Sequence, residues 1–379
     1  MKYFIIAGEA SGDMHGASLI SGILESDAQA SVRFVGGERM SAALASGGVS
    51  SDGMVADYRD GAVMGFSEVL CAVPSVLRRF RKLREEILSW RPDVVILIDY
   101  PWFNLKMARF ARRHGFKVFW YIAPKVWASR EGRLKAMAAY IDRLYVIFPF
   151  EVDYFRSKGM ECHYFGNPLI DAAGAHLAGD AAGLAPEEVR IALLPGSRKA
   201  EIRSMMPVYM GFADRARSEG KPWKFVIAAP GDADLSDYTD WVSGREDYVS
   251  VVKGDTASVL RLSRAAVVNS GTASLEAAVA GVPEVVCYRT SMLTYLIGKR
   301  IIKVPYICLC NLILGKMAVK ELIQNEFNIE SVYGEICELV QDGERRERMA
   351  EDFRHIRSLL GGGGAASAAA RDMVQSLKG

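Results

Sequence analysis

Short apolar runs alternate with longer segments of mixed polarity along the first half of the chain. The runs are short and rich in β-branched and aromatic residues, which is typical of buried strands. The segments between several of them have helical periodicity, as in Phe103–His114, where arginines share one face. Strands that alternate with helices predict a parallel sheet covered on both sides. The expected strands are Tyr3–Ala7, Val32–Val35, Val94–Ile98, Lys117–Tyr121, Arg143–Ile147 and His163–Phe165.

The same alternation restarts after a break near Gly166-Asn167-Pro168. The stretch Asp171–Pro186 is rich in Ala and Gly, which predicts a linker with at most one short helix. Beyond it we expect a helix over Ile202–Ser218. The further expected strands are Val189–Leu194, Lys224–Ala229, Tyr248–Val252, Ala265–Val268 and Glu284–Tyr288.

The chain has 379 residues, which is too long for one ordinary core and suits two domains. The predicted fold class is therefore α/β, with two Rossmann-like domains facing a cleft where the carboxyl ends of both sheets meet one ligand. The expected divisions are 1–168, 187–345 and a helical tail, 346–379. The tail has a charged helix over Val332–Leu360, a break at Gly361–Gly364 and an Ala-rich helix to Lys378. It either crosses back to the first domain or packs on a partner subunit.

Composition and charge exclude several classes of protein. Half of the residues are hydrophobic and 24% are charged, as in globular proteins. The formal net charge of +2 gives no general attraction to nucleic acid. The six cysteines have no CxxC spacing, so we expect buried thiols. The apolar N-terminal run is too short for a signal peptide, and no run approaches a membrane span. We therefore expect a cytoplasmic chain whose membrane contact is limited to a surface.

The most informative motif runs from Asn269 through Ser270, Gly271 and Thr272 to Glu276. A strand that ends in small polar residues and then opens a helix presents free N–H groups and the positive end of a helix dipole, which together bind anions. The Glu276 carboxylate, about one turn inside the helix, would accept hydrogen bonds from ribose hydroxyls. The motif indicates a nucleotide-diphosphate pocket. An ordinary capped strand-to-helix turn is the alternative.

A second anion-binding candidate follows the first strand of the second half, in Gly196-Ser197-Arg198 together with Glu201. The Arg198 guanidinium can form two hydrogen bonds to a phosphate, and Gly196 allows close approach of the ligand. The alternative is a surface arginine with Ser197 as a helix cap.

In the first half, a glycine-rich turn, Gly8–Gly16, follows the first strand. Its glycines lie four apart, so it is not the GxGxxG fingerprint of dinucleotide-binding proteins, and the chain has no P-loop. A ligand can still approach such a turn closely, and His15 lies in it. The alternative is the tight first turn of any α/β domain.

A candidate catalytic carboxylate, Asp99, follows the strand Val94–Ile98 in the segment Ile98–Asn104. Ligands of open α/β sheets bind at the carboxyl ends of strands. Pro101 and the neighbouring aromatic residues could form a partly desolvated pocket, in which a carboxylate becomes a stronger base. The alternative role of Asp99 is an N-cap for the next helix.

Other polar clusters carry weaker signals. The loop Ile122–Arg133 is dense in aromatic and basic residues, and either contacts sugar and phosphate or is a structural loop with a buried Trp127. Asp232 and Asp234 match the DxD pattern that holds a metal in some sugar transferases, but the polar surroundings favour a solvated loop. Cys308 and Cys310 are expected to pack in a core or line the cleft. The histidines are too scattered for a ligand set, so no metal site is predicted.

An apolar segment with Met64, Phe66 and Leu70 precedes a basic cluster that includes Arg78 and Arg79. This combination suits the surface of an anionic membrane or a lipid substrate. The alternative is an ordinary core-facing helix with a solvated basic end.

Taken in order, these segments resemble the lipid-A-disaccharide synthase family. The resemblance spans nearly the whole chain, and the ordered set of motifs is highly specific. The matching segments are GEASGD from Gly8, VMGFSEVL from Val63, IDYPWFN, APKVWASREGR, FGNPLID from Phe165, LLPGSRKAEI from Leu193, NSGTASLEAAVAGVP from Asn269, and VPYICLCNLILGK through KELIQNEF.

The resemblance implies a GT-B glycosyltransferase that needs no cofactor and is peripheral on the inner face of the inner membrane of Gram-negative bacteria. It would join UDP-2,3-diacylglucosamine to 2,3-diacylglucosamine 1-phosphate, giving a β-1,6-linked disaccharide 1-phosphate and UDP. A homodimer is an open alternative to a monomer. Family members commonly have Gln at the position of Lys125 and Pro at the positions of Cys310 and Lys320, so loop geometry near the site is expected to differ.

By matching position, Asp99 would be the catalytic carboxylate, while Arg198, Glu276 and Asn311 would fall among the nucleotide or active-site positions. We assign nucleotide contact to Gly12, Gly196, Ser197, Arg198, Asn269, Ser270, Gly271, Thr272, Glu276 and Asn311. We assign acceptor or membrane contact to Glu9, Ser11, Met64, Phe66, Leu70, Arg78 and Arg79.

Three other functions compete with this interpretation. A UDP-N-acetylglucosamine 2-epimerase, or another UDP-sugar transferase of GT-B fold, would share the nucleotide pocket but would not need the apolar segment from Val63. A two-lobed solute-binding protein would carry an export signal and would have no need of Asp99 and Arg198 together. An oxidoreductase would need a dinucleotide fingerprint after the first strand.

Overall fold

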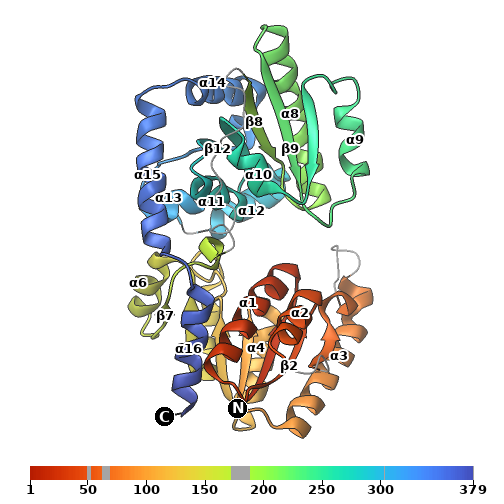
Figure 1. Cartoon of the computed structure of the whole chain (residues 1–379), viewed down its shortest axis with the longest axis vertical. Helices are drawn as coiled ribbons and strands as arrows, with labels where there is room; N and C mark the ends of the chain where they lie inside the picture. Colours follow the sequence, from red (N-terminus) through yellow and green to blue (C-terminus); the bar gives the residue numbers. More distant parts are fainter. Residues whose placement is uncertain (49–52, 62–68, 172–187, 303, 379) are drawn as a thin grey trace. The chain divides into compact units, whose positions relative to one another are not determined.

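The structure is a computed structural model that describes residues 1–48, 53–61, 69–171, 188–302 and 304–378, without the side chains of residues 60, 61 and 69–75. The chain divides into two compact units (Figure 1). Unit 1 comprises Met1–Pro168 and Gly363–Gly379, and unit 2 comprises Leu169–Gly362. The predicted fold class of two Rossmann-like units is confirmed.

Unit 1 is built on a seven-stranded parallel sheet in the order β3-β2-β1-β4-β5-β6-β7. Side chains of β1 alternate between two cores, with Tyr3 and Ile5 on one face of the sheet and Phe4 and Ile6 on the other. This alternation is why the strands read as continuous apolar runs. The strands are β1 (Lys2–Ala7), β2 (Ser31–Gly36), β3 (Met54–Asp57), β4 (Val94–Ile98), β5 (Lys117–Tyr121), β6 (Arg143–Val146) and β7 (His163–Tyr164). The helices are α1 (Ala10–Ser26), α2 (Glu38–Ser46), α3 (Val69–Trp90), α4 (Pro101–Arg113), α5 (Leu134–Tyr140), α6 (Pro149–Ser157) and α16 (Ala365–Lys378).

Unit 2 has a six-stranded parallel sheet in the order β10-β9-β8-β11-β12-β13. The strands are β8 (Val189–Leu194), β9 (Trp223–Ala229), β10 (Val249–Lys253), β11 (Ala265–Asn269), β12 (Glu284–Tyr288) and β13 (Lys320–Ile323). The helices are α8 (Lys199–Ser218), α9 (Ser236–Val242), α10 (Thr256–Arg261), α11 (Thr272–Ala280), α12 (Met292–Ile301), α13 (Leu309–Leu314), α14 (Ile329–Val340) and α15 (Glu344–Leu360).

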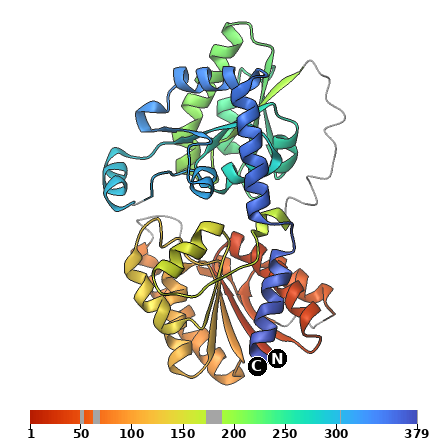
Figure 2. The same cartoon turned by 90° about the vertical axis from the view of Figure 1, so that its left-hand side faces the viewer.

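The last helix, α16, returns the chain to unit 1, where it packs along α1 (Figures 1 and 2). The two helices approach closely at Gly22, where an added Cβ would lie 2.8 Å from the Cα of Ser367 and 2.9 Å from the Cβ of Ala370. Asp372 accepts hydrogen bonds from Arg143 and from the hydroxyl of Tyr145. Helix α16 is therefore part of the unit 1 core, and the chain crosses back, as one of the two predicted alternatives has it. The first part of the predicted tail, through Gly362, belongs to unit 2 together with α15.

The structure differs from the prediction at three places. The strands β3 and β13 were not expected, because each has only four residues and lies at an edge of its sheet, where little of the strand need be apolar. The expected single helix over Val332–Leu360 is two helices, α14 and α15, separated by Gln341–Gly343. Among the described helices none is long and apolar enough to cross a membrane.

Candidate active site

The predicted motifs lie where the chain order reverses within each sheet. In unit 1, β1 is flanked by β2 and β4, so the turns after β1 and β4 are neighbours. In unit 2, β8 and β11 have the same relation, and the turns after them carry Gly196–Arg198 and Asn269–Thr272. Such a switch point leaves a crevice at the carboxyl edge of a parallel sheet, where α/β proteins bind ligands. The four predicted motifs that follow β1, β4, β8 and β11 therefore lie at the position that ligands favour in each unit.

Gly196 brings the two turns of unit 2 together. Its φ of +105° lies in the region that favours glycine. A Cβ there would lie 2.4 Å from Oε2 of Glu201 and 2.6 Å from Nδ2 of Asn269, and no side chain fits in that space. The residue is thus confined between a turn of its own segment and the end of β11.

Glu201 organises the turn that carries Arg198. Its Oε2 accepts hydrogen bonds from the backbone N–H groups of Ser197 and Arg198, at 3.1 and 3.3 Å. Its Oε1 accepts from Nη1 of Arg198 at 2.9 Å. The Arg198 side chain is nevertheless 80% exposed, so its remaining N–H groups are available to an anion at the start of α8. The sequence motif included Glu201 but gave it no role. Its position as the third residue of α8 is typical of a capping box, and this signal could have predicted its role.

The second turn opens α11 with uncapped backbone amides. Gly271 is the N-cap residue and makes no side-chain hydrogen bond to the first turn. The Ser270 hydroxyl points elsewhere, donating to the carbonyl of Ile307 at 3.1 Å, and Thr272 is exposed. The free amides at the start of this nine-residue helix and the exposed Arg198 on the neighbouring turn are donors of the kind that bind phosphate.

Glu276 lies one turn into α11 and is partly buried. Desolvation raises the pKa of its carboxyl group. A partly desolvated carboxylate on the helix that would hold a diphosphate is suited to accept hydrogen bonds from ribose hydroxyls.

The side chain of Asn311 is buried and hydrogen-bonded within unit 2, so it is not open to a ligand. Its amide nitrogen donates to the carbonyl of Val319 and to Oε1 of Glu321, both at 2.8 Å, and its oxygen accepts from the N–H groups of Ala318 and Val319. All four hydrogen-bonding positions of the amide are filled. Glu321 also accepts from the N–H groups of Ile307 and Cys308, so this network holds the segment whose carbonyl binds Ser270.

In unit 1 the turns after β1 and β4 are packed against each other. An added Cβ at Gly8 would lie 2.3 Å from the ring of Tyr100, so only glycine fits. Gly12 is buried against Ala7, which lets α1 start directly over the strand. Glu9 and Ser11 are exposed at this edge of the sheet.

Asp13, in the same motif, has a structural role. Its carboxylate is buried and accepts hydrogen bonds from the backbone N–H groups of Gly37, Arg39 and Met40, at 2.6, 3.2 and 3.2 Å. These groups begin α2, whose N-cap residue has no side-chain cap of its own. The acid therefore caps the neighbouring helix.

Backbone strain concentrates at the turn that presents Asp99. Asp99 and Tyr100 have φ values of +42° and +46°, in the left-handed region that few non-glycine residues adopt. The buried Asn104 stabilises the turn by donating to the carbonyls of Ile98 and Asp99, at 3.1 and 2.8 Å. Ile122, which follows the adjacent strand β5, has φ of +64°. Strain of this kind often accompanies functional residues.

The surroundings of Asp99 make its carboxyl group a weaker acid. Burial is the largest effect and the nearby Glu9 adds to it, while Lys125 opposes both; together they raise the pKa of Asp99 to about 6. No hydrogen bond from another side chain satisfies the carboxylate among the described residues. A group with this pKa is mostly ionised at neutral pH and remains basic enough to take a proton from a hydroxyl in the transition state.

The loop after β5 is held by a buried tryptophan, as one of the two predicted alternatives has it. Trp127 donates from Nε1 to Oε1 of Glu151 at 2.8 Å, and Glu151 also accepts from the N–H groups of Ile147 and Phe148. Burial raises the pKa of Glu151 to about 7. Lys125, an exposed residue of this loop, lowers the pKa of Asp99 through its positive charge.

The predicted membrane-contact residues are only partly described. Met64 and Phe66 lie outside the described residues, as does the side chain of Leu70. Arg78 is exposed on α3, and Arg79 is partly buried and donates to the carbonyl of Tyr58 at 3.3 Å.

Two clusters resemble metal sites by composition alone. Asp232 and Asp234 lie on an exposed loop, where Asp234 accepts from the N–H of Ser236, as expected of a solvated turn. Donor atoms of Glu284, Cys308 and Cys310 lie within 4.8 Å of one another in the core. Burial raises the pKa of Glu284, and hydrogen bonding with Cys308 and burial raise that of Cys310. The hydrogen bond with Cys310 lowers the pKa of Cys308. We interpret the cluster as buried core groups joined by hydrogen bonds.

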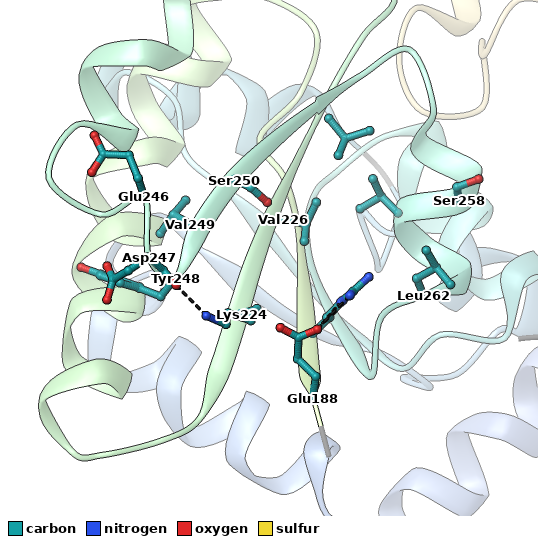
Figure 3. Close-up of a pocket in the computed structure, with 13 residues that line it drawn as sticks. Glu188, Lys224, Val226, Glu246, Asp247, Tyr248, Val249, Ser250, Ser258 and Leu262 are labelled. Carbon is teal, nitrogen blue, oxygen red and sulfur yellow. Dashed lines mark hydrogen bonds and ion pairs between the residues drawn. The ribbon is translucent and has the colours of Figure 1, made fainter. Parts of the chain in front are cut away.

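A groove of about 450 Å³ lies on one face of β8, β9 and β10 in unit 2 (Figure 3). Most of its charged residues, among them Glu188, Lys224 and Asp247, lie near the amino ends of the strands. Ligands of parallel α/β sheets bind at the opposite edge, and no predicted site residue lines the groove. We therefore place the candidate site at the carboxyl edges instead.

Two parallel-sheet Rossmann-like units are the architecture of the GT-B class of proteins. Solved structures agree on the fold. UDP-GlcNAc 2-epimerase from Neisseria meningitidis bound to UDP-GlcNAc superposes with a TM-score of 0.68 at 14% identity, covering 100% of both chains. MurG from Acinetobacter baumannii gives 0.60 at 13% identity, covering 99% of each.

Sequence comparison defines the family. The lipid-A-disaccharide synthetase family matches residues 3–370. The lipid-A-disaccharide synthase of Syntrophus aciditrophicus is 38% identical over 371 residues, which cover 97% of this chain and 95% of that protein. That of Geobacter sulfurreducens is 36% identical over 380 residues, covering 99% and 97%. The chain belongs to the lipid-A-disaccharide synthetase family.

Proposed function

We propose that this chain is a UDP-sugar-dependent glycosyltransferase that condenses UDP-2,3-diacylglucosamine with 2,3-diacylglucosamine 1-phosphate, releasing UDP and the lipid A disaccharide 1-phosphate. Family membership over residues 3–370 is the observation that carries this proposal. The residues at the two switch points supply chemistry that fits it. Nothing in the site favours the epimerase alternative.

Unit 2 would bind the UDP part of the donor. Displacement of UDP builds negative charge on the β-phosphate, and preorganised donors stabilise such charge best. The exposed guanidinium of Arg198 and the uncapped amides at the start of α11 are such donors. Glu276 would bind the ribose. Asn311 would act at a distance, by holding the segment to which Ser270 donates.

Unit 1 would supply the base. Asp99 would remove the proton of the acceptor 6-hydroxyl while that oxygen attacks the anomeric carbon, so one displacement inverts an α-linked donor to a β product. The raised pKa of Asp99 favours this role. Glu9 and Ser11, exposed beside the same turn, would contact the acceptor.

Both substrates carry acyl chains, so the enzyme would work at the cytoplasmic surface of the inner membrane. Met64, Phe66 and Leu70 with Arg78 and Arg79 are the proposed contacts, since apolar residues beside basic ones suit an anionic lipid surface. A homodimer remains a proposal that light scattering can test.

The direct assay is release of UDP from UDP-2,3-diacylglucosamine in detergent, with and without the acceptor. We expect release only when 2,3-diacylglucosamine 1-phosphate is present. Equal release without acceptor would indicate a hydrolase or an epimerase-like enzyme instead.

A further inference from the structure

Helix α12, Met292–Ile301, exposes its apolar side chains to solvent. No residue of the helix is buried. The exposed fraction is 70% for Leu293, 56% for Met292, 54% for Leu296, 50% for Ile297 and 49% for Ile301. Single exposed apolar residues are common on protein surfaces, but a contiguous group of this size marks an interaction site.

The exposed residues form one face of the helix. Positions 292, 293, 296, 297 and 301 recur at the spacing of a single helical stripe. Tyr295 and Gly298, three residues apart, are the less exposed positions and lie on the opposite side. The large apolar residues are therefore the ones that the helix presents to solvent.

The helix is anchored at its start, so its exposure is part of the fold. The N–H of Thr290 donates to Oε1 of Gln324 at 2.8 Å, and Nε2 of Gln324 donates back to the carbonyl of Thr290 at 3.1 Å. Ser291 caps the helix by accepting from the N–H of Thr294. The element begins directly after β12, at the carboxyl edge of the unit 2 sheet (Figure 1).

The sequence around this helix is basic. Between Glu284 and Glu321 the sequence has no acidic residue and six basic ones: Arg289, Lys299, Arg300, Lys303, Lys316 and Lys320. Lys299 and Arg300, in the last turn of α12, are exposed and make no ion pair within the described part of the chain. Basic residues beside an apolar helix face attract an anionic lipid surface and let the apolar side chains enter it.

We propose that α12 is a membrane-docking element, in which Leu293, Leu296 and Ile297 enter the interface of an anionic bilayer and Lys299 and Arg300 bind its phosphates. The proposal rests on the proposed function only in requiring a lipid surface to work on. It adds to the segment around Leu70 a second contact, carried by unit 2. A second copy of this helix would bring like charges together at Lys299 and Arg300, so these residues favour an anionic surface as the occupant.

The test is co-sedimentation of the full chain with vesicles, without substrates. One set of vesicles contains phosphatidylglycerol in phosphatidylcholine, and the other contains phosphatidylcholine alone. Leu293→Ser with Ile297→Ser should lower the bound fraction on anionic vesicles by about fivefold or more, because two inserted side chains are lost. The matched control is Leu88→Ser with Leu235→Ser, two comparably exposed leucines elsewhere, which should bind as the wild type does.

A charge variant distinguishes docking on anionic lipid from nonspecific hydrophobic binding. Lys299→Gln with Arg300→Gln should lower binding to anionic vesicles and leave binding to phosphatidylcholine unchanged. Unchanged sedimentation of either α12 variant, or an equal loss in the control, would overturn the proposal. So would a fall in oligomeric mass of the apolar variant by light scattering, which would identify a second copy as the occupant. These readouts need no turnover, so they can fail or succeed independently of the proposed reaction.

Discussion

At the scale of single residues, the strongest evidence for a working site is the turn at Asp99. Two successive left-handed residues cost free energy, of order 1–3 kcal/mol each, and the turn persists because Asn104 and the packing of Tyr100 on Gly8 hold it. The result is a half-buried carboxylate without a side-chain partner among the described residues, at the ligand-binding edge of the sheet. Its hydrogen bond to the backbone N–H of Tyr100 leaves the rest of the carboxylate available to a substrate hydroxyl.

Replacing that carboxylate tests the proposed role. Asp99→Asn should lower the turnover rate by roughly 10²–10⁴-fold, the usual contribution of a general base. The affinity for UDP, measured by calorimetry, should stay within about twofold because unit 2 is untouched. Near-normal turnover would remove Asp99 from the mechanism; lost UDP binding would indicate a damaged fold.

The pH dependence of activity should report the pKa of Asp99. Because this pKa is raised to about 6, the rate should fall as the pH drops below that value and the base becomes protonated. Glu9 raises the pKa, so Glu9→Gln should move this acidic limb to lower pH. Lys125 lowers it, so Lys125→Gln should move the limb to higher pH. Profiles of kcat/KM that do not shift in these opposite directions would contradict the assignment.

Gly196 provides a test of the nucleotide half. Gly196→Ala combines an unfavourable φ with two contacts under 3.0 Å, so it should displace Glu201 and with it Arg198. We expect the Kd for UDP to rise by about tenfold or more, since a charged phosphate contact is lost. Gly220→Ala is a matched control, because its φ is also positive but an added Cβ meets nothing within 4 Å. Equal affinities in both variants would refute the role of this turn.

How much of the site could be predicted depends on whether the signal is local in sequence. Arg198 and Asn269–Thr272 follow apolar strands closely, so they could be predicted from the rule that ligands bind at the carboxyl ends of strands. The structural roles of Asp13 and Asn311 could not be found that way, because Asp13 caps a helix 24 or more residues away and the Asn311 network depends on Glu321. Asp13 lies in the Gly8–Gly16 motif, and the family resemblance assigned Asn311 to the site. Only tertiary contacts show that both support other elements.

At the scale of elements, strongly apolar strands were predicted and weak ones were not. Each central strand has a continuous apolar run because helices cover both faces. The edge strand β3 has no fully buried residue, so its sequence carries little signal. The break between α14 and α15 was also missed, since a short polar turn at Gln341–Gly343 interrupts the helical pattern without a proline.

The exposed apolar face of α12 is a feature of a whole element that could not be predicted from the sequence. The run Met292–Ile301 has the composition of a core helix, and composition cannot tell which side of a helix meets the protein. Its exposure depends on where β12 and Gln324 place it.

At the scale of the whole molecule, the chain returns to its first unit through α16. Ala369, Ala370, Met373 and Val374 belong to the same core as β1 and α1. The hydrogen bonds of Asp372 to Arg143 and Tyr145 fix the orientation of the helix. Residues at the two ends of the chain are therefore needed for one folded unit.

This arrangement predicts a specific loss of stability. Asp372→Ala leaves the partly buried Arg143 and Tyr145 groups without this acceptor, so it should lower the free energy of unfolding of unit 1 by about 1–3 kcal/mol. Calorimetry should show the shift in the transition that UDP does not stabilise, because UDP would bind unit 2. A shift confined to the UDP-stabilised transition would contradict this account.

The central claim is the reaction itself, and the structure of the product tests it most directly. The wild-type protein would be incubated with UDP-2,3-diacylglucosamine and 2,3-diacylglucosamine 1-phosphate, and the product analysed by mass spectrometry and NMR. We predict a disaccharide 1-phosphate whose anomeric coupling identifies a β-1,6 linkage. An α linkage would contradict the single displacement, and a UDP-sugar altered only at carbon 2 would show that the chain is an epimerase.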